Sequence, residues 1–143
     1  MNWVRQEKRL AIYLRDGMAC AYCGTGLEDG ERFTLDHIKP TNRGGTNEAS
    51  NLITACERCN CSKQDRSMWA FAKACAAYLD NGIKPEDIRS HVLRCTKAEL
   101  PILEAKRLIA RRGSAAKVMA AVRAQRQPLN GQMNKFRAPG DRI

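Results

Sequence analysis

The chain has 143 residues and a formal net charge of +10, with a sequence pI near 9.6. This length allows one compact domain with a modest core and an appended helical segment, and it argues against a long cleft enzyme. The strong positive charge favours a polyanion such as nucleic acid as the partner. The surplus is uneven: residues 1–67 carry ten Lys and Arg against nine Asp and Glu, whereas residues 68–143 carry fifteen against six.

The sequence predicts no membrane partner. No apolar run approaches the roughly 18 to 20 residues that span a bilayer. The N-terminal stretch MNWVRQEKRL is charged, whereas a signal peptide is apolar at this position. We therefore expect a cytoplasmic, intracellular location.

The first part of the chain predicts a helix followed by a strand. Residues 2–16 mix apolar and charged side chains at about helical spacing, and Gly17 supplies a stop. In residues 32–38, Arg-Phe-Thr-Leu-Asp-His-Ile, the side chains alternate as in a short strand that Pro40 ends.

A loop, a second strand and a helix should come next. The segment TNRGGTNEAS, residues 41–50, is rich in turn-forming residues. Residues 51–56, NLITAC, indicate a second short strand or an extended turn, and residues 57–66 begin a helix. The order is therefore strand, loop, strand, helix.

The last part of the chain predicts helices. Ser67 can cap a helix over residues 68–80, and a Pro-Glu-Asp start predicts another over 85–94. Residues 101–112 and 114–126 form either two helices or one interrupted helix. The sequence from residue 127 onward has little periodicity, which is typical of a mobile tail.

The chain has seven cysteines. An odd number without an export signal argues against a disulfide framework. Four of them form two Cys-x-x-Cys pairs, in which both sulfurs can point at one ion about 2.3 Å away, so two pairs complete a closed tetrahedral zinc site with a structural role. A redox dithiol would use one pair and leave the other idle. The predicted zinc ligands are Cys20, Cys23, Cys56 and Cys59.

The other three cysteines, Cys61, Cys75 and Cys95, are expected to be reduced and mostly packed thiols.

The sequence contains three stretches in this order: CAYCG, LDHIKPTNRGG and NLITACERCNCSK. Together they resemble the HNH endonuclease family, in the group whose ββα-metal fold is braced by a four-cysteine zinc site. The resemblance covers about residues 20–63. The third signature position, a histidine in the family name, holds Asn60 here, so the chain resembles an H-N-N variant.

The resemblance implies an α+β fold: a small ββα-metal (HNH) core with a structural zinc site, flanked by an N-terminal helix and a C-terminal helical extension. We expect residues 1–67 to form the nuclease domain with its N-terminal helix and zinc site. Residues 68–127 should form a helical extension on or after that core, and residues 128–143 a basic, flexible tail.

Phosphodiester hydrolysis needs a base that deprotonates water and positive charge near the phosphate. His37 can supply the base, since a neutral imidazole accepts a proton near physiological pH. By the resemblance, Asp36 and Asn60 bind one catalytic divalent cation, Mg²⁺ or another, whose hard character suits carboxylate and amide oxygens. Asn51 is expected to support the hairpin and help orient His37. In an ideal strand Asp36 and His37 point to opposite sides, so both reach one phosphate only if the strand is distorted at its end.

Basic residues near the signature are candidate phosphate contacts. Residues 105–143 hold ten Lys and Arg and one acidic residue, which could add salt-sensitive affinity for a DNA duplex, although RNA or a protein partner for the C-terminal helices stays open. His91 lies away from the signature and is interpreted as structural or exposed. The candidate nucleic-acid contacts are Arg43, Arg58 and Lys63.

The function expected from these observations is that of a metal-dependent DNA endonuclease acting on double-stranded DNA, by nicking or double-strand cleavage. Two alternatives stay open. One is a zinc-containing module that binds nucleic acid without cleaving it. The other is a protein-interaction adaptor, for example in a phage packaging complex, because the family includes small phage proteins. Under each of these functions, we expect the protein in a bacterial or phage-infected cell.

Overall fold

The structure is a computed structural model that describes residues 3–126. It begins with helix α1, Gln6–Arg15, and continues to an antiparallel hairpin of strands β1, Phe33–His37, and β2, Leu52–Cys56. The short helix α2, Glu57–Lys63, follows β2 directly and packs on the hairpin. These elements have the predicted strand, loop, strand, helix order, and the predicted α+β fold is confirmed.

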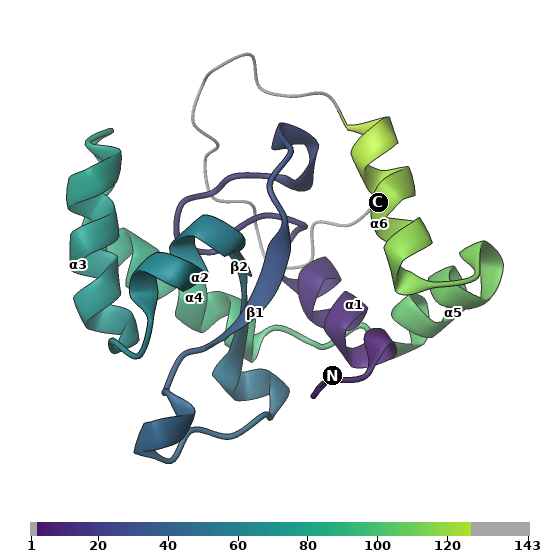
Figure 1. Cartoon of the computed structure of the whole chain (residues 1–143), viewed down its shortest axis with the longest axis horizontal. Coiled ribbons are helices and arrows are strands. Elements are labelled where there is room, and N and C mark those ends of the chain that lie inside the picture. Colours follow the sequence, from purple (N-terminus) through teal and green to yellow (C-terminus); the bar gives the residue numbers. More distant parts are fainter. Residues whose placement is uncertain (1–2, 127–143) are drawn as a thin grey trace.

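Four further helices flank this centre (Figure 1). In Figure 1 the first two lie on one side of the hairpin, while the last two lie on the other side, next to α1. Their bounds are α3, Met68–Leu79; α4, Pro85–Lys97; α5, Ile102–Arg112; and α6, Ala115–Gln125.

Two hydrophobic clusters hold these layers together. In the first, side chains of α3 and α4 pack with the cysteine loop and β2; Phe71, Val92 and Ile53 all belong to this cluster. In the second, α1 packs with β1, α5 and α6, for example through Leu10 and Val118. The helices after residue 67 are therefore part of the same packed interior as the hairpin.

A buried ion pair fixes the end of α1 against the hairpin. Arg15 Nε donates to Asp16 Oδ1 at 2.8 Å, and the two side chains are 1% and 0% exposed. The Arg15 guanidinium also donates to the carbonyl oxygens of Ala49 and Leu52, at 2.8 and 2.7 Å. Asp16 Oδ2 accepts from both the backbone N–H and the hydroxyl of Thr54, each at 2.8 Å. Each charged group thus has hydrogen-bonding partners, as burial requires.

The connection from β1 to β2 is long and shaped by close backbone contacts. It contains the short 3₁₀ turns Thr41–Arg43 and Ala49–Asn51. Gly45 N–H donates to the Pro40 carbonyl at 3.0 Å. A Cβ atom at Gly45 would collide with the backbone carbonyl of Lys39, so this position needs glycine. Gly44 has φ of +88° and takes the left-handed conformation that ends the first turn.

Three predicted boundaries need correction. The helix expected over residues 2–16 begins only at Gln6, because Arg5 before it is in an extended conformation. The helix expected over 57–66 ends at Lys63, because Gln64 takes a positive φ of 53°. The helix expected over 85–94 continues to Lys97. The predicted tail, residues 128–143, lies outside the described residues. Within residues 3–126, no helix is both long and apolar enough to cross a bilayer.

Candidate active site and zinc site

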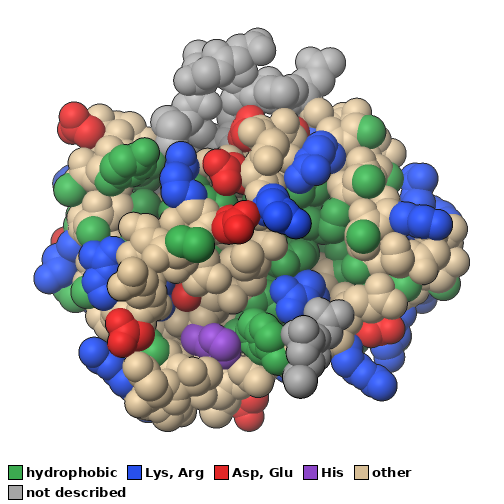
Figure 2. Space-filling view, in the orientation of Figure 1, with side chains coloured by type: hydrophobic (Ala, Val, Ile, Leu, Met, Phe, Trp, Pro, Cys, Tyr) green, Lys and Arg blue, Asp and Glu red, His purple; other side chains and the backbone are tan. Residues whose placement is uncertain are grey.

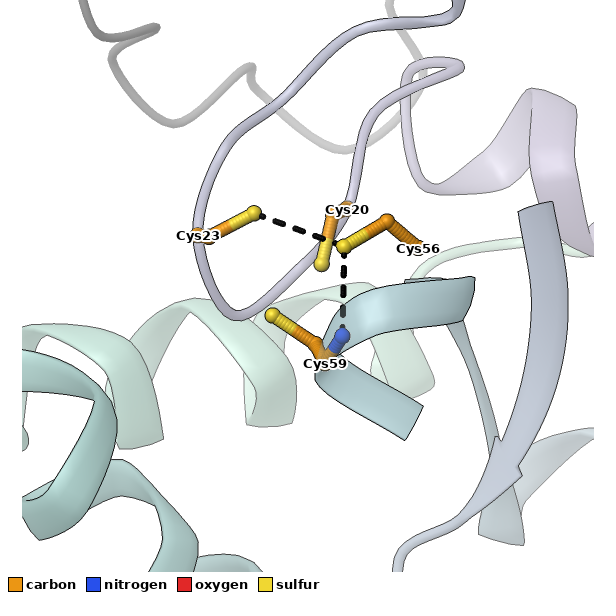
Figure 3. Close-up of side chains that lie close together, drawn as sticks. All are labelled: Cys20, Cys23, Cys56 and Cys59. Atoms are coloured by element: carbon orange, nitrogen blue, oxygen red, sulfur yellow. Dashed lines mark hydrogen bonds between the residues drawn. The ribbon is translucent and has the colours of Figure 1, made fainter. Parts of the chain in front are cut away.

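Four cysteine sulfurs converge beside the hairpin (Figure 3). All four side chains are buried, and their Sγ atoms lie within 4.8 Å of one another. The Sγ atoms of Cys23 and Cys56 are 3.7 Å apart. An ideal tetrahedron with zinc–sulfur bonds of about 2.3 Å has edges of about 3.8 Å. The predicted ligands Cys20, Cys23, Cys56 and Cys59 therefore form a group that could hold zinc.

Local structure brings the two pairs together from distant parts of the sequence. The first pair lies in a tight loop in which Cys20 N–H donates to the Thr25 carbonyl at 2.8 Å. In the second pair, Cys56 ends β2 and caps α2, so that its sulfur accepts the Cys59 N–H at 3.4 Å. Hydrogen bonds from the neighbouring thiols, first from Cys20, lower the pKa of Cys23 and Cys56. Burial raises the pKa of Cys20, and hydrogen bonds from the neighbouring thiols raise that of Cys59.

A polar hollow lies at the end of β1, on another part of the hairpin. It is open to solvent, has a volume of about 250 Å³, and is lined by Asp36, His37 and Asn60 together with loop residues. The structure thus brings the three predicted catalytic and cation-binding side chains to one site. Figure 2 shows a face of the molecule on which histidine reaches the surface. The other histidine, His91, is buried, with 2% exposure. The remaining lining residues are Leu35, Pro40, Thr41, Asn42, Gln64 and Asp65.

Asp36 lies at the inner wall of the hollow and is 4% exposed. Tyr22 donates its hydroxyl to Asp36 Oδ2 at 2.6 Å, and Lys63 Nζ donates to Oδ1 at 3.3 Å. Burial raises the pKa of the Asp36 carboxyl, while the charge of Lys63 and the Tyr22 hydrogen bond act in the opposite direction. Burial also raises the pKa of Tyr22, which keeps its hydroxyl protonated as a donor. An ionised carboxylate has about four lone-pair sites, so these two donors do not exhaust it.

Asn60 reaches the same wall from α2. Its Nδ2 donates to the Thr34 hydroxyl at 2.8 Å. Thr34 and Asp36 are two residues apart on β1, so their side chains share one face of the strand. This hydrogen bond occupies the amide nitrogen of Asn60 and leaves its oxygen as an acceptor.

His37 occupies the last position of β1 and is half-buried. Its Nε2 lies 2.7 Å from the side-chain oxygen of Asn47, in the loop between the strands. Trp3 stacks on the ring, with centroids 4.9 Å apart and an interplanar angle of 24°. Neither contact was predicted from sequence. Trp3 lies 34 positions before His37, and Asn47 is one of several polar residues in a turn-rich loop.

Asn51 supports the loop beside His37 instead of contacting the imidazole. Its side chain accepts from Lys39 N–H at 2.9 Å and donates to the carbonyl oxygens of Lys39 and Thr46, at 3.1 and 2.8 Å. Its backbone carbonyl accepts the Ile38 N–H at 2.9 Å. Through these contacts Asn51 holds the two ends of the hairpin loop together. The side chain that reaches the His37 imidazole nitrogen is that of Asn47.

The three candidate phosphate contacts occupy different environments. Arg43 is exposed in the loop that borders the hollow. Arg58 is exposed beside the four cysteines, where its Nη2 lies 3.9 Å from Cys23 Sγ and its guanidinium lies over the Tyr78 ring. Lys63 is 0% exposed, and its Nζ also donates to the His37 carbonyl at 3.0 Å. Lys63, a candidate phosphate contact by sequence, is therefore an interior partner of Asp36.

Comparison with known proteins relates the hairpin region to one family. Residues 20–66 match the model of a family described as HNH endonuclease. The chain is 42% identical over 68 residues to a CRISPR-associated endonuclease Cas9 of Actinomyces naeslundii. The matched segment covers 47% of this chain and 6% of that protein. It is 38% identical over 60 residues to a Cas9 of Corynebacterium diphtheriae, covering 41% of this chain and 5% of that protein.

A solved structure, that of the type II-C Cas9 enzyme from Actinomyces naeslundii, is similar with a TM-score of 0.47 and 26% identity. The similarity covers 88% of this chain and 12% of that chain. This chain therefore spans a small fraction of the length of the proteins that it matches.

Proposed function

We propose that the HNH endonuclease domain formed by residues 20–66 is a metal-dependent DNA nuclease that hydrolyses phosphodiester bonds. The observation that carries this proposal is the polar hollow in which Asp36, His37 and Asn60 meet. Their side chains offer a carboxylate, an imidazole and an amide, which are the groups needed to hold a hard cation and to accept a proton from water.

The donor set fits a divalent cation. Asp36 offers carboxylate oxygens, and Asn60 offers an amide oxygen because its nitrogen is bound to Thr34. Mg²⁺ prefers oxygen ligands and usually keeps several waters, so two protein ligands in an open hollow suit it. When bound, such a cation would stabilise the negative charge that builds on the phosphate.

His37 is assigned the role of general base. The ring borders the open hollow, so water and a phosphate can reach it. A neutral imidazole can take the proton from an attacking water and release it to solvent afterwards. Tyr22 and Lys63 hold the Asp36 carboxylate in place from the interior side, and they are assigned no proton transfer.

The four-cysteine group is assigned a structural zinc ion. It joins the loop before β1 to the start of α2, and with four protein ligands it has no open position for a substrate. The zinc would therefore stabilise the fold around the hollow while taking no part in the reaction.

Double-stranded DNA is proposed as the substrate because the surplus positive charge lies in the helices after the HNH domain. Residues 102–126 contain seven Lys and Arg and one acidic residue, and most of the cations are exposed. Such charge attracts phosphate backbones without regard to sequence.

One observation favours a second candidate, a module that binds nucleic acid without cleaving it. The ammonium of Lys63 lies within 3.3 Å of both Asp36 oxygens and could substitute for a cation there. In that case the hollow would bind phosphate or DNA weakly and perform no hydrolysis.

Cleavage of supercoiled plasmid DNA by the purified full chain, with and without added Mg²⁺, separates the two candidates. We expect Mg²⁺-dependent conversion to nicked or linear DNA. The Asp36→Ala variant should lose this activity, and higher Mg²⁺ or Mn²⁺ should restore part of its rate, because Asn60 would remain as a ligand. Binding of the plasmid without cleavage under every metal condition would favour the module that only binds.

A further inference from the structure

We propose that the segment before the HNH domain positions His37, with Trp3 and Lys8 acting as positioning residues together with Asn47 of the hairpin loop. The inference rests on the proposed function for the role of His37, but its structural part stands on contacts outside the reaction. Trp3 and Lys8 precede residues 20–66, the part of the chain that matches the family model.

The His37 imidazole is held on two sides. The Asn47 side-chain oxygen fixes the ring edge at Nε2, over 2.7 Å. Trp3 covers one ring face at a centroid distance of 4.9 Å. One contact restricts movement in the ring plane and the other restricts tilting out of it, so together they define a single ring orientation.

Both partners of the imidazole are in turn held by α1. Lys8, in α1, donates its Nζ to the Asn47 backbone carbonyl at 2.7 Å. Arg9, also in α1, lies over the indole of the stack, with its guanidinium carbon 5.7 Å from the Trp3 centroid. The buried Arg15 and Asp16 at the end of α1 fix that helix to β2. The ring is therefore positioned by α1 through two separate contacts.

The contact with Asn47 also determines where the imidazole carries its proton. An amide oxygen can only accept a hydrogen bond, so this contact requires the proton of a neutral His37 to lie on Nε2. Nδ1 is then the ring nitrogen with a free lone pair, and it is the atom that can accept a proton from water. Asn47 thus selects the tautomer as well as the orientation of the base.

A tautomer measurement tests this inference without relying on cleavage. The full chain is labelled with ¹⁵N-histidine and studied at about pH 8.5, well above the ordinary imidazole pKa of about 6.5. A His91→Gln variant identifies the signals of His37. We expect His37 to carry its proton on Nε2 in the parental chain and in Asn47→Asp, which keeps an acceptor, and to show mixed tautomers in Asn47→Leu.

The Trp3 contact has its own spectroscopic signature. A ring stacked on an indole has its carbon-bound proton resonances shifted upfield, and Trp3→Ala should remove this shift while Trp3→Phe should keep part of it. Lys8→Met keeps the apolar stem but removes the donor, so it should loosen the loop and give a tautomer mixture between those of the parental chain and Asn47→Leu.

The kinetic arm separates positioning from binding. Asn47→Leu and Trp3→Ala should lower kcat for plasmid cleavage by about 10- to 100-fold, with KM for DNA nearly unchanged. Asn47→Asp should recover most of the rate. Asn81→Leu, which removes an exposed loop asparagine between α3 and α4, serves as the matched control and should cleave at the parental rate.

The two arms fail independently. A parental chain that shows the predicted tautomer but does not cleave DNA would support the positioning and contradict the proposed function. A parental His37 that carries its proton on Nδ1, or whose tautomer mixture is the same after Asn47→Leu, would overturn the positioning even if the chain cleaves DNA. Folded state is checked in each variant by zinc content and circular dichroism.

Discussion

At the residue scale, the electrostatic balance of the hollow depends on Lys63. Its ammonium is 0% exposed and contacts the 4% exposed Asp36 carboxylate at 3.3 Å. Such a pair contributes modestly to stability as a whole, but removal of one partner leaves a buried charge uncompensated. The Lys63 side chain therefore has a stabilising role that a surface phosphate contact would not have.

Lys63→Met should lower the free energy of unfolding by about 3 to 5 kcal/mol, because Asp36 would lose its charged partner inside the protein. Urea denaturation followed by circular dichroism measures this. Lys39→Met, which alters an exposed lysine of the neighbouring loop, should change stability little. Equal stability of the two variants would contradict the interior role of Lys63.

The residues of the site differ in how far the sequence could predict them. His37, Asp36 and Asn60 belong to the stretches that resemble HNH endonucleases, and the structure places them around one hollow. Asn47 and Trp3 carry no such signal, because their roles arise only when the loop and the N-terminal segment meet at the imidazole. The burial of Lys63 also depends on how α2 packs on β1, which the charge of a lysine does not reveal.

At the element scale, local signals predicted most of the helices. Ser67 caps α3 as expected, accepting the Ala70 N–H at 3.1 Å. The sequence does not distinguish one C-terminal helix from two. The structure has two, because Gly113 takes φ of +104° and Ser114 caps α6. Helix α4 runs on to Lys97 because no glycine or proline follows Arg94 directly, and Ala98 in an extended conformation ends it.

Zinc removal should unfold the hairpin and α2. These elements are short, and zinc binding supplies folding free energy of about 10 kcal/mol or more in such sites. Cys56→Ser should therefore lose zinc and much of the circular dichroism signal of residues 20–63. Cys61→Ser, which alters an exposed cysteine five residues further on, is the matched control and should keep both. Retention of zinc and of the parental melting curve by Cys56→Ser would contradict the assignment.

Acid should destabilise the α3 and α4 layer through His91. Burial, with a smaller contribution from the charge of Arg94, lowers the pKa of His91 to about 4, whereas the unfolded value is about 6.5. The folded chain therefore binds fewer protons between these values. Its stability should be full above about pH 6.5 and should fall as the pH drops toward about 4, by on the order of 3 kcal/mol.

The pH dependence is measured by urea denaturation at several pH values. His91→Leu should remove most of this decline, whereas His37→Ala, which removes the half-buried histidine, should retain it. An identical decline in His91→Leu and the parental chain would assign the acid sensitivity to other groups.

At the scale of the whole molecule, the helices after residue 67 form two pairs that pack against different parts of the chain. Helices α3 and α4 share a core with the cysteine loop. Helices α5 and α6 pack on α1, and Arg123 of α6 donates to the carbonyl oxygens of Leu27 and Glu31 in the loop that leads from the cysteines to β1. The strongest positive charge therefore lies on helices that pack beside α1.

Charge removal from α5 should weaken DNA binding and reduce its salt dependence. Arg111 and Arg112 are exposed in the last turn of α5, and replacement of both by Gln should reduce the slope of log K against log salt by about 0.9 for each phosphate that is no longer neutralised. Arg94 and Lys97, in the last turn of α4, are the matched pair and should have a smaller effect. Equal slopes in the parental chain and in both double variants would indicate that α5 and α6 bind another partner.

The central claim is that His37 is the base of a nuclease, and single-turnover cleavage of DNA by His37→Ala at saturating protein and Mg²⁺ tests it most directly. The four-cysteine group and the basic helices do not include this imidazole, so zinc content, melting and DNA affinity should stay close to the parental values. The cleavage rate should fall by about 10² to 10⁴, and added Mn²⁺ should not restore it. Cleavage at the parental rate, in a preparation free of contaminating nuclease, would contradict the assignment of His37 as the base.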